Sequence, residues 1–135
     1  MKILIADKDI KRGESIEHQF NKLGYFSVLT LSNYRDLRTL TYYCPQRLGM
    51  VVVSEELLEE MAIEPTRFFE ENALIRHLLV FNPKKDHLWS KTFFNPHPTR
   101  WMRLVSKFDF EQLTDFLMLV DPVSEEVIQS DSLFK

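Results

Sequence analysis

Seven polar residues that could carry chemistry stand directly after four short apolar runs of the chain. They are Asp7, Lys8, Asp9, Ser54, Asn82, Ser106 and Lys107. Carboxylates can hold a hard cation or act as nucleophiles, and a lysine can neutralise the charge on transferred oxygens. In open parallel sheets, ligands and catalytic groups gather beyond the carboxyl ends of the strands. If the apolar runs are such strands, these residues meet at one end of the sheet.

Five apolar or β-branched runs alternate with segments of helical spacing. The expected strands cover residues 3–6, 25–31, 50–53, 77–81 and 101–105. Four helical regions are expected. The first covers residues 10–23, and the second begins near Asn33 and ends before Pro45. The third runs from 55 to about 72, where Pro65 breaks or kinks it, and the last covers 110–120. The Ser54 hydroxyl is expected to cap the third of these helices. Such alternation predicts an α/β domain with a doubly wound, five-stranded parallel sheet.

Two stretches fall outside this alternation. Residues 83–100 are the least regular part of the chain and contain prolines at 83, 96 and 98. From Asp121 onward the chain becomes polar and acidic. We therefore expect one domain over residues 1–120, followed by a polar tail, linker or short extra helix over 121–135.

The composition is that of an ordinary globular protein. The formal net charge is −3, the content of hydrophobic residues is 44%, and there are only three glycines and one cysteine. A single cysteine excludes an internal disulfide and a multi-cysteine metal site, and no run is long enough to span a membrane. We expect a cytoplasmic protein that has no cofactor or metal and binds neither nucleic acid nor membrane.

Two short motifs carry a resemblance to a known family. The opening Lys2–Asp9 (Lys-Ile-Leu-Ile-Ala-Asp-Lys-Asp) resembles the start of response-regulator receiver domains, where the first strand ends in an acidic cluster. Val105–Leu113 is similar to the end of strand five in that family, where Lys-Pro-Phe precedes an acidic-hydrophobic helix start. The similarity covers roughly residues 2–120. It implies a flavodoxin-like, CheY-like three-layer α/β/α fold.

The residues that phosphorylation needs in that family are largely replaced here. Asp7 matches the first acid of the Mg²⁺-binding pair, Lys8 stands where the second belongs, and Asp9 lies one step further. Ser54 falls at the phospho-acceptor aspartate, and Asn82 takes the place of the Thr or Ser that ends strand four. Without a gap, Ser106 occupies the place of the family's lysine, whereas a one-residue gap would restore Lys107.

The two losses at Lys8 and Ser54 together imply a degenerate phosphorylation pocket. A serine is not activated by a pocket built for carboxylate chemistry, and Lys8 would repel the cation. Lys8 is expected to pair with Asp7 or Asp9 and to fill the metal position. The resemblance thus implies a pseudo-receiver in bacterial signal transduction, with no catalytic activity, that acts by protein–protein interaction. The alternatives are a divergent receiver that is phosphorylated with Asp7, Asp9 and Lys107, and a small flavodoxin-like enzyme or nucleotide-binding domain, which the missing phosphate loop disfavours.

Aromatic and basic residues gather in residues 81–110. The candidate interaction residues are Trp89, Phe93, Phe94, Trp101, Arg103 and Phe108. In receiver domains this is the region of helix four, strand five and helix five, which is used for dimers or partners, and aromatic anchors with arginine favour interfaces. The alternative is that these aromatics fill the core. Since residues 55–71 are acidic, a homodimer or a docked protein partner could form by charge complementarity.

Overall fold

The computed structural model describes residues 1–43, 47–84, 100–106 and 108–121, and the backbone of 90–94. Six strands form one sheet: β1 (Ile3–Ala6), β2 (Val28–Leu31), β3 (Leu48–Ser54), β4 (Ile75–Phe81), β5 (Ser90–Phe94) and β6 (Trp101–Val105). Their order is β2-β1-β3-β4-β6-β5. Every pair is parallel except β5 with β6. The five parallel strands follow the 2-1-3-4-5 order of flavodoxin-like folds, so the expected fold class is confirmed.

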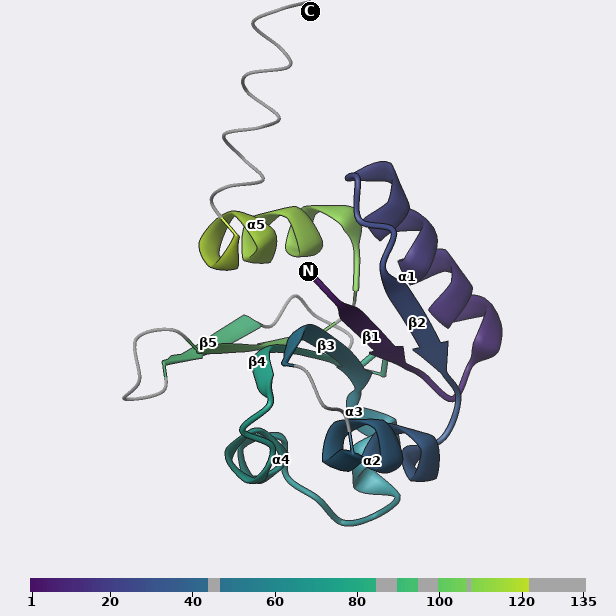
Figure 1. The fold of residues 1–135 in the computed structure, drawn as a ribbon, viewed down its shortest axis with the longest axis vertical. Coiled ribbons are helices and arrows are strands. Elements are labelled where there is room, and N and C mark those ends of the chain that lie inside the picture. The colour runs from purple at the N-terminus through teal and green to yellow at the C-terminus, as the bar shows by residue number, and fades with distance from the viewer. Residues whose placement is uncertain (44–46, 85–89, 95–99, 107, 122–135) are drawn as a thin grey trace, which may run out of the picture.

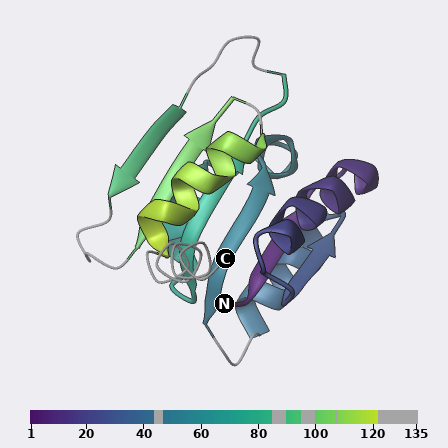
Figure 2. The same ribbon diagram turned by 90° about the horizontal axis from the view of Figure 1, so that it is seen from above.

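Helices cover both faces of the sheet. They are α1 (Ile10–Lys22), α2 (Tyr34–Tyr43), α3 (Glu55–Glu59), α4 (Pro65–Glu71) and α5 (Phe110–Val120). Figure 1 shows α1 and α5 on one face and α2, α3 and α4 on the other, and Figure 2 shows α1 and α5 lying side by side over the sheet. The result is the expected three-layer α/β/α arrangement.

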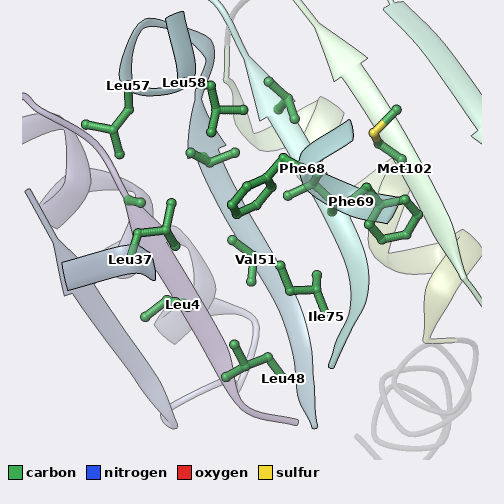
Figure 3. Packing of buried hydrophobic residues seen from close by; sticks show 14 residues of the cluster. Leu4, Leu37, Leu48, Val51, Leu57, Leu58, Phe68, Phe69, Ile75 and Met102 are labelled. Atoms are coloured by element: carbon green, nitrogen blue, oxygen red, sulfur yellow. The ribbon is translucent and has the colours of Figure 1, made fainter. Parts of the chain in front are cut away.

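The strands alternate their side chains between two apolar cores. Leu4, Val51 and Leu78 face α2, α3 and α4, where Phe68 and Phe69 of α4 pack over the sheet (Figure 3). Ile5 and Val52 face the other way, toward α1 and α5. Strands buried on both faces need continuous apolar runs, which is why the runs predicted them well.

The helical region after β3 divides at the expected place. Pro65 occupies the first turn of α4, where its missing N–H costs no helical hydrogen bond. The chain between α3 and α4 turns through Ala62, whose φ is +54°. Two short helices therefore replace a single kinked one.

The connection from β4 to β6, predicted to be the least regular part of the chain, contains a sixth strand. Within this connection the described residues form β5, an antiparallel edge strand on β6, and no helix. Phe93 pairs with Met102 and Phe94 with Trp101 in the backbone register. The strands β5 and β6 and the helix α5 occupy the side of the molecule on which the interaction surface is predicted (Figure 2).

The last described residue is Asp121, the C-cap of α5. The expected tail, linker or extra helix over 122–135 lies outside the described residues, as does Lys107. Among the described helices, none has the length and apolar character that crossing a membrane requires.

Candidate functional site at the carboxyl ends of the strands

Four of the candidate residues come together at the carboxyl ends of the parallel strands. Asp7, Ser54, Asn82 and Ser106 follow or end β1, β3, β4 and β6, and all four are buried. The register explains their proximity, because Ala6 pairs with Val53 and the next level of the sheet pairs Ser54 with Phe81. The expectation that these residues share one end of the sheet is confirmed.

Asp7 is held by an arginine that the sequence reasoning did not single out. The Nε of Arg12 donates to Asp7 Oδ2 at 2.5 Å, and its Nη2 donates to Asp7 Oδ1 at 2.8 Å. The Asp7 side chain is 0% exposed, and that of Arg12 is 30% exposed. This bidentate pair is the strong geometry for arginine and carboxylate, and it raises the pKa of the Arg12 guanidinium.

The start of α1 places Arg12 in this position. Asp9 is the N-cap of the helix, and its carboxylate accepts from the Arg12 N–H at 3.2 Å. The Asp9 N–H in turn donates to Asp7 Oδ1 at 2.9 Å. The first turn therefore directs Arg12 back over the end of β1, where its guanidinium carbon lies 5.6 Å from the centre of the Phe81 ring. One further hydrogen bond and a cation–π contact thus support the pair.

Lys8 does not fill the metal position, which corrects the expectation that it pairs with Asp7 or Asp9. Its Nζ forms an ion pair with Glu60, and both side chains are exposed. That hydrogen bond raises the pKa of Lys8. The cation next to Asp7 is therefore Arg12.

Ser54 is the least satisfied polar residue of the site. It is 0% exposed, and its Oγ has no hydrogen-bond partner in the part of the chain that the structure describes. Ser54 is the N-cap of α3 by position, but its side chain makes no capping bond. The expected hydroxyl cap is therefore wrong, because the buried side chain belongs to the strand register and faces the same side of the sheet as Phe81.

Asn82 and Ser106 close the site on the β4 and β6 side. The Asn82 N–H donates to Val105 O at 3.1 Å, and its Oδ1 accepts from the Lys84 N–H at 3.0 Å. The Asn82 amide thus stabilises the turn after β4. Lys84 Nζ lies 4.0 Å from Glu56 Oε2. One of the expected ion pairs between the acidic and the basic segments therefore forms within the chain.

The residues at this site do not fit a bound divalent cation. Both oxygens of Asp7 already accept from Arg12, and Ser54 and Lys8 offer no carboxylate. Among the described residues, no three His, Cys, Asp or Glu side chains form a group that could hold a metal. A cavity of about 150 Å³ lies beside Asp7 between α1 and the end of β2, lined in part by Gly13 and Ser32. Its volume is about half the lower limit of common ligand pockets.

Three of the six candidate interaction residues can be placed, and they pack on the α5 side of the sheet. Trp101 and Phe108 are half-buried members of the core under α1 and α5, and the Phe108 ring lies 5.9 Å from that of Phe81. The guanidinium carbon of Arg103 lies 5.3 Å from the centre of the Phe116 ring. Trp101 and Phe108 therefore contribute to the core. Trp89 lies outside the described residues, and Phe93 and Phe94 are placed by their backbone only.

His77 is a buried residue in β4 that the chemistry at the strand ends does not use. Its Nδ1 accepts from the Trp101 N–H at 3.2 Å, and its side chain is 2% exposed. Burial, together with repulsion from Arg76 and Arg100, lowers the pKa of His77 to about 4. The ring is therefore neutral at pH 7 and part of the fold.

Comparisons of this chain with protein-family models, with curated proteins and with solved structures found no match.

Proposed function

We propose that this chain is a receiver-like interaction module, a pseudo-receiver of bacterial signalling in the cytoplasm, that is not phosphorylated on aspartate. The observation that carries the proposal is the bidentate Asp7–Arg12 pair, which supplies a built-in cation where a receiver uses a metal. The flavodoxin-like strand order and the position of Ser54 at the end of β3 support it.

The chemical argument starts from the charges. An acyl phosphate forms when a carboxylate attacks a phosphoryl group whose oxygens are neutralised by a cation and a lysine. The end of β3 offers a hydroxyl in place of that carboxylate, and the Arg12 guanidinium already has its partner. The charges of Asp7 and Arg12 therefore balance each other permanently, and the pocket is not suited to a conformational switch that a phosphoryl group controls.

The test is phosphorylation of the full chain. The protein is incubated with acetyl phosphate and Mg²⁺, and its intact mass is measured; we expect no 80-Da adduct. In parallel, beryllofluoride with Mg²⁺ is added while amide resonances are recorded, and we expect no shifts at Ser54 and Asn82. An adduct, or shifts confined to these strand ends, would favour the divergent receiver and sink the proposal.

The matched control separates the missing acceptor from the added cation. In Ser54→Asp, the carboxylate returns but Arg12 still engages Asp7, so we expect no adduct. In Ser54→Asp with Arg12→Gln, the cation that blocks Asp7 is also removed. If the single variant is phosphorylated as readily as a working receiver, the role that we assign to Arg12 is wrong.

The partner surface that we propose lies along α5. Phe110, Met118 and Leu119 of this helix are 45%, 51% and 37% exposed, and Arg103 packs on Phe116 of the same helix. Exposed apolar side chains next to an arginine suit a protein partner or a second copy of the chain. Sedimentation at low and high salt tests self-association, and we expect a salt-dependent dimer if the second copy is the partner. A monomer at both salt concentrations would leave a different protein as the partner.

A further inference from the structure

The strand β2 is an open edge of the sheet. Within the described part of the chain, β2 pairs with β1 alone and stands at the end of the strand order (Figure 1). Ser27 O and Leu31 O accept from β1. Because backbone groups alternate along a strand, the N–H and C=O groups of Val28 and Thr30 point away from β1. The strand contains neither proline nor a charged residue, so its edge can accept another strand.

Apolar side chains accompany this edge on the α2 face of the sheet. Phe26 and Leu29 are 76% and 51% exposed. Together with Leu40 of α2 and Leu48 of β3, they line a groove of about 350 Å³. Leu29 pairs with Leu4 in the backbone register, and Leu4 belongs to the core under α2, α3 and α4. The outward backbone groups and the apolar groove therefore lie beside each other, as the docking of another strand requires.

The two ends of the groove carry opposite charges. Lys2 lines the groove near the beginning of β2, where the next residue, Ile3, donates its N–H to Ser27 O at 2.9 Å. Asp36 lies in the first turn of α2, which follows the carboxyl end of β2. It precedes Leu40 by one helical turn, so it shares the side of α2 that faces the groove. Both charged residues are exposed. A partner that matches this edge needs an anion at one end and a cation at the other.

A second copy of this chain has that complementarity when its β2 strand runs antiparallel. In a two-fold pairing that matches Val28 with Thr30 of the second copy, each such pair exchanges both of its backbone hydrogen bonds. Leu29 then faces Leu29 of the second copy across the axis, in a pair whose side chains lie close together. The same rotation brings Lys2 to the level of Asp36 of the second copy. A parallel copy would instead bring like charges to the same level.

We propose that two copies of this chain associate through their β2 edges, with the strands antiparallel and Leu29 next to the two-fold axis. The two sheets then join into one, and the open edge is removed. Because β2 has only 4 residues, the interface is smaller than the roughly 1,200 Å² that stable complexes bury, and we expect a weak dimer with a dissociation constant on the order of 100 µM. Such a dimer is independent of the proposed function and leaves α5 open to a different protein.

Sedimentation and amide hydrogen exchange of the full chain test this pairing at protein concentrations from roughly 10 µM to roughly 1 mM. We expect mostly monomers at the low end and mostly dimers at the high end. The Val28 and Thr30 amides, which face the open edge, should exchange about fivefold more slowly at the high concentration. The Leu29 and Leu31 amides face β1 and should not change with concentration.

Substitutions of Leu29 test the register. In Leu29→Asp, like charges meet across the two-fold axis, so we expect the dissociation constant to rise at least about tenfold. Leu29→Lys should weaken the dimer in the same way. An equimolar mixture of the two variants should form a heterodimer, because opposite charges then face each other. If the unsubstituted chain dimerises and this mixture does not, the proposal is overturned.

The matched control is Met118→Asp, because Met118 of α5 is also 51% exposed and lies away from the β2 edge. We expect its dimer to be as stable as that of the unsubstituted chain. A dimer that is lost in Met118→Asp and kept in Leu29→Asp would overturn the proposal and assign self-association to α5. A monomer at all concentrations would also overturn it. So would protection of the Val28 and Thr30 amides that does not depend on concentration, because residues of the same chain would then cover the edge.

Discussion

Replacing Arg12 by methionine perturbs the central contact of the candidate site while keeping most of the side-chain volume. Two hydrogen bonds, of 2.5 and 2.8 Å, connect Arg12 to a carboxylate that is 0% exposed. In the variant, Asp7 keeps the hydrogen bond from the Asp9 N–H at 2.9 Å. A methionine can still pack against the Phe81 ring. The change therefore removes the charge partner and little of the packing.

The expected loss follows from the burial of the two partners. Breaking a fully buried ion pair by removing one partner costs about 3–5 kcal/mol, because the other charge stays buried without compensation. Since the Arg12 side chain is 30% exposed, water can reach part of the pair. We therefore expect the lower limit, a loss of about 3 kcal/mol in the free energy of unfolding, or roughly a hundredfold in the unfolding constant.

Urea denaturation at pH 7 measures this loss, and a second substitution identifies its cause. In Asp7→Asn/Arg12→Met the buried charge is absent, so we expect a free energy of unfolding within about 1 kcal/mol of the unsubstituted chain. Lys8→Met is the control, because its exposed pair with Glu60 should not move the denaturation midpoint. A loss below about 1 kcal/mol in Arg12→Met would refute the argument that Arg12 neutralises a buried carboxylate.

Substitutions at three further polar residues test other contacts of the fold. The pKa of His77 is lowered to about 4, so the folded state binds a proton at this residue less readily than the unfolded chain. The free energy of unfolding should be complete above pH 6.5 and fall by about 2 kcal/mol toward pH 4, which is less than the full pKa shift implies because water screens Arg76. In His77→Gln, the urea midpoint should not show this fall over the same pH range. Arg100 donates to the carbonyls of Ile75, Phe69 and Asn72, so Arg100→Met should lower the denaturation free energy by about 2 kcal/mol, and Arg100→Lys should recover little because ammonium lacks the planar fork. Ser54→Ala removes a hydroxyl that has no partner in the described structure, so the melting temperature should stay equal or rise, and a clear fall would reveal a bound group there.

The sequence predicted the parallel part of the fold because that part depends on buried apolar runs. The strand over 101–105 and the helix over 110–120 have their predicted bounds. At β3 the prediction was too short, since Leu48 and Gly49 pair at its beginning and Ser54 at its end. Polar or small residues at strand ends take part in the ladder through their backbone, which hydrophobicity does not report.

The strand β5 escaped prediction for a different reason. Alternation of strands and helices predicts a helical connection between parallel neighbours, and prolines at 83, 96 and 98 suggested an irregular segment. An edge strand needs one neighbour only, so a five-residue run such as Ser90–Phe94 can pair with β6 without a strong pattern of its own. The pairing depends on contacts with β6, and the local sequence of residues 90–94 does not indicate these contacts.

At the candidate site, the sequence identified the residues at the strand ends but assigned the cation wrongly. Lys8 was expected to fill the metal position because it stands at a family position, whereas Arg12 lies within a helix and matches no motif. A geometric signal was present in the sequence. A helix capped by Asp9 directs its third residue back toward the cap, and Arg12 is that residue.

In the proposed pseudo-receiver, an arginine in place of the metal changes what the pocket can respond to. A bound cation can enter and leave, and a receiver couples this exchange to the charge of a phosphoryl group. Arg12 is covalently part of the chain and keeps its proton at any physiological pH, so the charge of Asp7 is neutralised in every condition that preserves the fold. If the proposed pseudo-receiver function is correct, its regulation must act outside the strand ends. Exposed apolar side chains on α5, such as Met118 and Leu119, offer one surface for it.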